Sequence, residues 1–185
     1  ALALPSAGRV LLPLCGKTLD IAWLLAAGYQ VVGVELSELA VQQLFAELGA
    51  TPRIQVLNDA LQRYETDYLT VFVGDIFALN REQLGPVDAI YDRAALVALP
   101  ATLRSRYASH LTAISTGARQ LLVSFDYEQS QLPGPPFAVL TEELSELYGQ
   151  HYELQALARH PLAGGLKGQC PADEVVWLPP PRAWP

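Results

Sequence analysis

The first half of the sequence alternates short apolar runs with stretches of helical character. Arg9–Leu14 is an apolar run, and Leu19–Ala27 carries apolar residues at helical spacing. The same order returns at Gln30–Glu35 and in the segment from Ser37, a candidate N-cap, to about Leu48. Apolar strands separated by helices indicate a mostly parallel sheet covered by helices on both faces. The sequence therefore predicts an α/β fold.

The rest of the chain is predicted to add strands and helices less regularly. The segment Thr51–Asp67 is polar and poorly periodic, which fits a hairpin or a short helix. Further strands are expected at Leu69–Val73, Val87–Tyr91, Gln120–Phe125, Tyr152–Leu157 and Glu174–Leu178, and helices at Leu103–Leu111 and at Thr141–Tyr148, with Thr141 as its cap. The closing strands lack a helix between them, so the sheet should finish antiparallel at one edge. No repeat or linker divides the chain, which predicts one domain over residues 1–185.

The composition excludes several classes of protein. Hydrophobic residues make up 51% of the chain and charged residues 17%, which excludes a disordered chain. A net charge of −7 argues against nucleic acid or an anionic membrane as a partner. Cys15 and Cys170 are too few for a disulfide framework or a four-ligand zinc site. We therefore expect reduced thiols, a cytoplasmic location, no metal and a monomer.

Two residues at the ends of the first two strands suggest a ligand site. In doubly wound sheets ligands bind at the carboxyl ends of the strands. Pro13-Leu14-Cys15-Gly16-Lys17 follows the first strand, and its glycine allows close approach of the backbone to a ligand. Glu35 ends the second strand 19 residues after Gly16, the spacing of an acid that accepts hydrogen bonds from ribose hydroxyls. The alternatives are a plain strand-to-helix turn and a Glu that caps the next helix.

The next strand ends carry further polar residues. The third predicted strand runs into Gly74-Asp75-Ile76-Phe77, where Asp75 can accept from the amine of adenine while Ile76 and Phe77 flank the ring. An Asx turn is the alternative for Asp75. The following strand ends in Asp92 and Arg93, which either form an ion pair at the rim or place Arg93 on an anionic group of a ligand.

A proline-rich loop follows the fifth predicted strand. Its residues Pro133-Gly134-Pro135-Pro136-Phe137 lose little entropy on ordering. The loop either forms a wall of an acceptor pocket or makes a rigid connection in which Phe137 plugs the core.

Four motifs in this order resemble the thiopurine S-methyltransferase family, its bacterial branch above all. They are Arg9–Leu24 (RVLLPLCGKTLDIAWL), Val31–Val41 (VVGVELSELAV), Ile90–Pro100 (IYDRAALVALP) and Pro133–Phe137 (PGPPF). The resemblance covers essentially the whole chain. It implies a Rossmann-like class I methyltransferase fold of seven strands that uses S-adenosylmethionine and releases S-adenosylhomocysteine.

The resemblance also implies roles for individual residues. The cofactor is expected to contact the residues of the four strand ends, namely Leu14, Gly16, Glu35, Asp75, Ile76 and Arg93. Arg93, in the Asp-Arg motif, is also the expected catalytic residue beside the acceptor, with Phe137 in the acceptor pocket. Family members carry a second Arg near the acceptor. The present sequence offers only Lys167 there, since Arg159 is displaced.

Members of the family also have an N-terminal segment with Trp and Phe residues that covers the site. The chain contains no Met, so Ala1 is not a natural start, and we expect this segment to be missing and the site to be open. The implied reaction is direct transfer of the methyl group to the sulfur of a small aromatic or heterocyclic thiol, such as a thiopurine. Other small thiols, halides and selenium or tellurium species stay open as acceptors. Two alternative functions also stay open: an NAD- or nucleotide-dependent enzyme, and a non-catalytic module that binds S-adenosylmethionine or a nucleotide.

Overall fold

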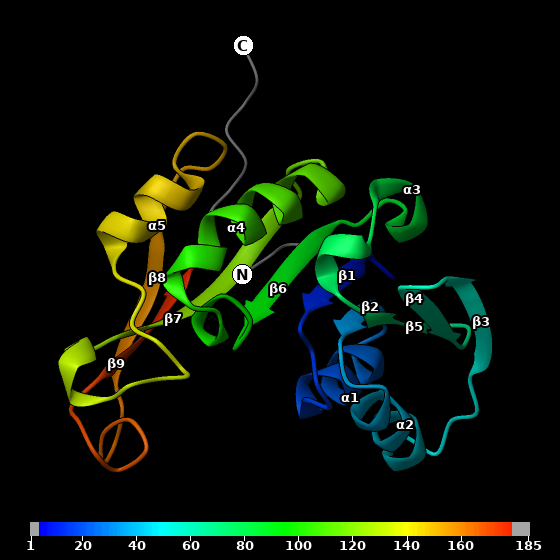
Figure 1. The fold of residues 1–185 in the computed structure, drawn as a ribbon, viewed down its shortest axis with the longest axis horizontal. Coiled ribbons are helices and arrows are strands. Elements are labelled where there is room, and N and C mark those ends of the chain that lie inside the picture. The colour runs from blue at the N-terminus through cyan, green and yellow to red at the C-terminus, as the bar shows by residue number, and fades with distance from the viewer. Residues whose placement is uncertain (1–3, 179–185) are drawn as a thin grey trace. The chain divides into compact units, whose positions relative to one another are not determined.

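The structure, a computed structural model, describes residues 4–178, which form two compact units, 4–91 and 92–178 (Figure 1). The strands of the first unit are β1 (Arg9–Pro13), β2 (Gln30–Glu35), β3 (Arg53–Asn58), β4 (Leu61–Glu65) and β5 (Leu69–Gly74). Its helices are α1 (Leu19–Ala26), α2 (Glu38–Glu47), the 3₁₀ turn η1 (Ile76–Ala78) and α3 (Arg81–Leu84). Strand β6 (Ala89–Arg93) begins in the first unit and ends in the second.

The first unit is built on a sheet with the strand order β3-β4-β5-β2-β1-β6. Strands β5, β2, β1 and β6 are parallel, whereas the hairpin β3–β4 continues the sheet in antiparallel fashion beyond β5. Gly33 of β2 lies between Leu12 of β1 and Val71 of β5. Because the four parallel strands point the same way, the residues after their carboxyl ends meet at one edge of this sheet.

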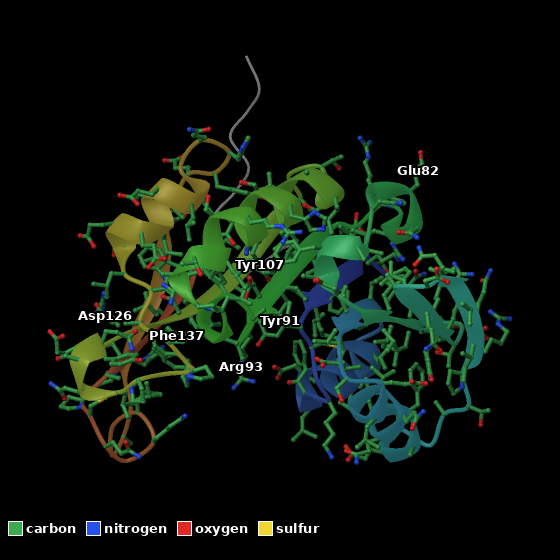
Figure 2. All side chains as sticks on the ribbon, in the orientation of Figure 1. Glu82, Tyr91, Arg93, Tyr107, Asp126 and Phe137 are labelled. Carbon is green, nitrogen blue, oxygen red and sulfur yellow. The ribbon has the colours of Figure 1, made fainter. Side chains whose placement is uncertain are left out.

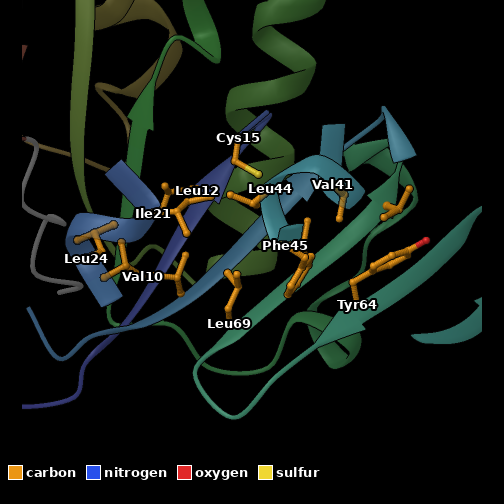
Figure 3. Packing of buried hydrophobic residues seen from close by; sticks show 13 residues of the cluster. Val10, Leu12, Cys15, Ile21, Leu24, Val41, Leu44, Phe45, Tyr64 and Leu69 are labelled. Atoms are coloured by element: carbon orange, nitrogen blue, oxygen red, sulfur yellow. The ribbon is translucent and has the colours of Figure 1, made fainter. Parts of the chain in front are cut away.

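Helices α1 and α2 cover one face of this sheet. Thr18 caps α1 by accepting from the backbone of Asp20, and Ser37 caps α2 by accepting from the backbone of Ala40. The buried apolar residues of both helices, Ile21 and Leu24 of α1 and Val41, Leu44 and Phe45 of α2, join those of the strands in one cluster (Figure 3). Its members are Val10, Leu12, Cys15, Ile21, Leu24, Val31, Val41, Leu44, Phe45, Tyr64, Leu69, Val71 and Val73.

The second unit contains three strands of the sheet that pair in antiparallel fashion. Its elements after β6 are η2 (Leu96–Ala98), α4 (Ala101–Ser115), β7 (Arg119–Asp126), η3 (Gln129–Gln131), α5 (Thr141–Tyr148), β8 (Ala156–Pro161) and β9 (Asp173–Trp177). Strand β9 lies between β7 and β8 and is antiparallel to both. Helices α4 and α5 contact each other. A small cluster that includes Tyr127, Leu132 and Cys170 closes the end of this unit where the proline-rich loop lies.

The elements differ from the predictions at four places. The described residues contain nine strands rather than seven, because residues 53–65 form the hairpin β3–β4, one of the two structures expected of that segment. The strand expected at Tyr152–Leu157 begins only at Ala156, since Tyr152 is buried in a turn that continues from α5 and donates to the carbonyl of Ala118. Thr141 is the first helical residue rather than the cap of α5, and Leu140 takes the cap position without a side-chain bond. The short helix α3 was not predicted.

Candidate functional site

The turn after β1 is held in an unusual backbone conformation. Leu14 has a φ of 48° and Gly16 a φ of 52°, in the left-handed region that favours glycine. The N–H of Cys15 donates to the carbonyl of Val34 in β2, and the N–H of Thr18 donates back to the carbonyl of Cys15. Apart from Gly16 itself and its two neighbours in the chain, no heavy atom lies within 4 Å of where a Cβ on Gly16 would sit. The turn therefore leaves open space beside its backbone, as the approach of a ligand requires.

Glu35 links this turn to the start of α2. One oxygen of its carboxylate accepts from the N–H of Gly16 at 2.7 Å, and the other accepts from the N–H of Ser37 at 2.9 Å. The second bond is the helix-end contact that the sequence left open as an alternative. A carboxylate has about four acceptor sites on its two oxygens, so each oxygen of Glu35 retains capacity for one hydroxyl of a ribose.

The residues after β5 lie beside Glu35, because Glu35 pairs with Val73 in the parallel sheet. The carboxylate of Asp75 accepts from the N–H of Phe77 at 3.0 Å, which is the Asx-type turn that the sequence left open as an alternative, and its side chain is exposed. Ile76 is buried and Phe77 is half-buried. The structure therefore brings Leu14, Gly16, Glu35, Asp75 and Ile76 to one edge of the first unit.

Asp92 and Arg93 point in opposite directions at the end of β6. Asp92 is completely buried and accepts from the hydroxyl of Tyr107 at 2.7 Å and from the N–H of Leu96 at 3.0 Å. The side chain of Arg93 is exposed and extends away from the strand end (Figure 2). An exposed Asp92–Arg93 pair at the rim is therefore wrong for Asp92. Its carboxylate instead ties the backbone of Leu96, which follows Arg93, to the end of β6, and the hydroxyl of Tyr107 holds it from α4.

Burial raises the pKa of Asp92 to about 6, although both hydrogen bonds favour its charged form. Between about pH 4 and pH 6 the folded chain then holds a proton at Asp92 that the unfolded chain has released. The stability that this group contributes is thus present at low pH and is lost as the pH rises through about 6. We expect wild type to lose stability relative to Asp92→Asn as the pH rises. The free energy of unfolding of wild type minus that of the variant should therefore be more positive at pH 4.5 than at pH 7.5. Urea unfolding at both pH values measures it, and equal differences would contradict the assignment.

Contacts from outside the proline-rich loop hold Phe137 in place. The N–H of Phe137 donates to the carbonyl of Val97, and the guanidinium of Arg104 lies 5.5 Å from the centre of its ring. Arg104 is itself fixed by an ion pair with Glu143, in which one guanidinium nitrogen donates to both carboxylate oxygens, at 2.7 and 2.8 Å. A Cβ on Gly134 would lie 2.4 Å from the ring of Phe137, so the loop folds tightly over it. Sequence reasoning missed Arg104, which no local motif marks.

Two clefts flank this loop within the second unit. One, of about 690 Å³, is lined by residues that include Arg104, Tyr127 and Phe137. The other, of about 180 Å³, lies between the prolines and Lys167. The ammonium of Lys167 donates to the carbonyl of Pro135 at 2.7 Å. Lys167 thus contacts the loop that also carries Phe137. Arg159 pairs instead with Asp126 and Asp173.

Cys15 lies in the turn with its side chain buried. Burial, and then the charge of Glu35, raise its pKa to about 12. At pH 8 the thiolate is then on the order of one part in ten thousand, and the thiolate is the reactive form.

We expect the folded chain to resist iodoacetamide at Cys15 at pH 8, and the same thiol to react after unfolding in urea. Peptide mass spectrometry reads out each site, and Cys170, also buried, serves as an internal comparison. Rapid alkylation of Cys15 in the folded chain would show that the thiol is accessible and ionised.

Within residues 4–178 no group of three or more His, Cys, Asp or Glu side chains is arranged to hold a metal ion. The helices of this range also include none that is both long enough and apolar enough to cross a membrane.

Comparison with solved structures identifies the fold. The chain is similar to an S-adenosylmethionine-dependent methyltransferase from Methanosarcina mazei, with a TM-score of 0.68 and 16% identity over 96% of this chain and 94% of that one. It is also similar to magnesium protoporphyrin IX methyltransferase from Synechocystis with bound S-adenosylmethionine, with a TM-score of 0.64 and 17% identity over 95% and 71% of the two chains. The predicted class I methyltransferase fold is confirmed.

Comparison with known sequences identifies the family. Residues 1–167 match the model of the thiopurine S-methyltransferase family. The chain is 56% identical to thiopurine S-methyltransferase of Xanthobacter autotrophicus over 170 residues, which are 92% of this chain and 79% of that protein. It is 50% identical to that of Teredinibacter turnerae over the same shares. The chain thus belongs to the thiopurine S-methyltransferase family and is an S-adenosylmethionine-dependent methyltransferase.

Proposed function

We propose that this chain transfers the methyl group of S-adenosylmethionine to the sulfur of a small aromatic or heterocyclic thiol, with thiopurines as the first class to test. The relatives at 56% and 50% identity are thiopurine S-methyltransferases, which supports a sulfur acceptor. The single observation that carries the cofactor half of the proposal is Glu35, whose two carboxylate oxygens are aimed by the N–H groups of Gly16 and Ser37. Residues 1–185 would then act as one methyltransferase domain.

The donor groups at the edge of the first unit suit S-adenosylmethionine. Glu35 would accept from the ribose hydroxyls, and the backbone of Leu14 and Gly16 would lie beside the methionyl part. Asp75 and Ile76 would contact the adenine. This assignment requires no rearrangement of Glu35, because its bonds to the backbone leave acceptor capacity on both oxygens.

The acceptor half of the proposal rests on the second unit. When bound, S-adenosylmethionine supplies a methyl group on a sulfonium, which is activated enough to be transferred by direct displacement without a covalent enzyme intermediate. Arg93 would stabilise the thiolate form of the acceptor or hold its anionic group in a planar, bidentate contact. Phe137 would offer an apolar wall, supported from behind by Arg104. Lys167 would add a second positive charge near the same loop. Alignment of the reactants then supplies most of the rate enhancement.

A cytoplasmic location and a monomeric state complete the proposal. Both cysteines are free thiols, which fits a reducing compartment.

The test is an acceptor panel with purified protein. Formation of S-adenosylhomocysteine together with a methylated thiol, seen by mass spectrometry with 6-mercaptopurine or thiophenol, would support the proposal. Methylation of selenite, tellurite or iodide alone would show that the acceptor is not a thiol. Tight cofactor binding without turnover on any of these acceptors would indicate a binding module, and a titration that favours NAD would overturn the cofactor assignment.

A further inference from the structure

The turn that carries Arg93 is closed by the side chain of Asp92. Arg93 ends β6, and Ala94 and Ala95 lead from it into η2. Ala94 has a φ of 66°, in the left-handed region, which is unfavourable for a residue with a Cβ. The carboxylate of Asp92 spans this turn, because it accepts from the N–H of Leu96 at 3.0 Å. This bond offsets part of the cost of the backbone conformation beside Arg93.

Two buried phenols face the same carboxylate from other elements. The second oxygen of Asp92 accepts from the hydroxyl of Tyr107 on α4 at 2.7 Å, and both residues are completely buried. Burial, and then the charge of Asp92, raise the pKa of Tyr107 well above its usual value. They do the same to the pKa of Tyr148 on α5. Burial raises the pKa of Asp92 only to about 6, so Asp92 is the member of this group that changes its charge near neutral pH.

The charge of Asp92 does more for the turn than for the stability of the fold. An Asn would present an oxygen to the N–H of Leu96 and an amide N–H to the hydroxyl oxygen of Tyr107, with no charge to bury. The ionised carboxylate instead forms hydrogen bonds about twice as strong as neutral ones. It therefore holds the turn more firmly than an amide, although burial disfavours its charged form. Such groups gather at functional sites.

We propose that Asp92 is a positioning residue for Arg93, whose carboxylate, held by Tyr107, keeps the turn closed and the guanidinium in place for the acceptor thiol. Protonation turns one of the two oxygens of Asp92 into a hydroxyl, which is a weaker acceptor, and the turn loosens. The rate on the acceptor then falls as the pH drops through about 6. The inference rests on the proposed function, because it takes Arg93 to act on the acceptor.

The amide resonance of Leu96 tests the coupling without any turnover. In isotope-labelled protein saturated with S-adenosylhomocysteine, its chemical shift should titrate with a midpoint near pH 6, since its N–H donates to Asp92. The midpoint should rise in Tyr107→Phe, because the hydroxyl favours the charged form of Asp92. The titration should disappear in Asp92→Asn and persist in Asp67→Asn, the same change at an exposed position. Persistence of the titration in Asp92→Asn, or its absence from wild type, would overturn the proposal.

Steady-state rates test the consequence for the acceptor. The acceptor is pentafluorothiophenol, which stays ionised between pH 4.5 and pH 7.5, at saturating S-adenosylmethionine. We expect kcat/KM of wild type to fall ten-fold or more from pH 7.5 to pH 4.5, because small misplacements of a catalytic group are costly. Asp92→Asn, neutral at every pH, should show the low value at both, and Asp67→Asn should follow wild type. In Tyr107→Phe the midpoint of the fall should lie at a higher pH than in wild type.

Arg93→Lys, measured alongside at pH 7.5, separates two kinds of failure. A wild-type rate for Arg93→Lys would overturn the role of Arg93 in the proposed function. A loss in Arg93→Lys together with a wild-type pH profile in Asp92→Asn would overturn only the role of Asp92. If Asp92→Asn does not fold, Tyr107→Phe decides, and an unshifted midpoint in its rates contradicts the proposal.

Discussion

Replacing Glu35 by Gln is expected to lower the affinity for S-adenosylmethionine by ten-fold or more. The amide has only one oxygen, whereas both oxygens of Glu35 accept backbone N–H groups, from Gly16 and from Ser37. Hydrogen bonds to a charged group are worth about 1.5–3 kcal/mol, and the substitution removes the charge. The amide NH₂ would also face a backbone donor on one side. Calorimetry with S-adenosylhomocysteine measures the loss.

The effect on the ribose must be separated from the effect on the turn. A 2′,3′-dideoxy analogue of S-adenosylhomocysteine lacks the hydroxyls that Glu35 is proposed to bind. If Glu35 binds them, Glu35→Gln costs this analogue much less affinity than it costs the parent ligand. An equal loss for both ligands would confine Glu35 to holding the turn, and an unchanged dissociation constant would remove it from the site. Glu47→Gln, which removes an exposed carboxylate paired with Lys17, is the matched control.

The sequence was most informative where local signals agree. The bounds of α1 and α2 were predicted closely, because apolar residues recur at helical spacing in both helices and Ser37 marks the start of α2. The parallel strands that precede the two helices are apolar except at their end residues, and they were equally clear.

The failures came where tertiary contacts decide. The edge strand β3 exposes Ile54 and Val56, so it has no alternation of buried and exposed residues that would reveal it. Tyr152 looked like part of a strand, yet it packs at the end of α5, where its ring lies edge-on to that of Tyr148. A side chain buried by packing carries the same apolar signal whether its backbone is a strand or a turn.

The candidate site shows the same division. Glu35 was found from its distance in sequence to Gly16, because the spacing of strand and helix fixes where the next strand ends. The partner of Asp92, in contrast, is Tyr107, which lies 15 residues away on α4. Adjacent opposite charges suggested an ion pair, but successive side chains in a strand point to opposite sides. Only the fold shows that Asp92 turns inward.

Arg93→Lys is expected to lower kcat/KM for an aromatic thiol by ten-fold or more, although the positive charge remains. Arg93 is exposed at the end of β6, between the buried Asp92 and the backbone of Leu96, whose N–H donates to the carboxylate of Asp92. If its guanidinium stabilises a thiolate or fixes the acceptor, the planar fork of donors matters, and Lys lacks that fork and holds its charge on a flexible stem. The melting temperature should stay close to that of wild type, because an exposed cation contributes about 0–1 kcal/mol to stability.

The measurement uses steady-state rates at saturating S-adenosylmethionine, with calorimetry of S-adenosylhomocysteine on the same samples. Arg81→Lys, an equally conservative change at an exposed position on α3, is the matched control and should leave both quantities unchanged. A wild-type kcat/KM for Arg93→Lys would rule out the catalytic assignment. A fall in kcat/KM that is matched by an equal loss of cofactor affinity would place the guanidinium on the cofactor instead. A fall with unchanged cofactor affinity would place it on the acceptor, because only the step that involves the thiol would then have changed.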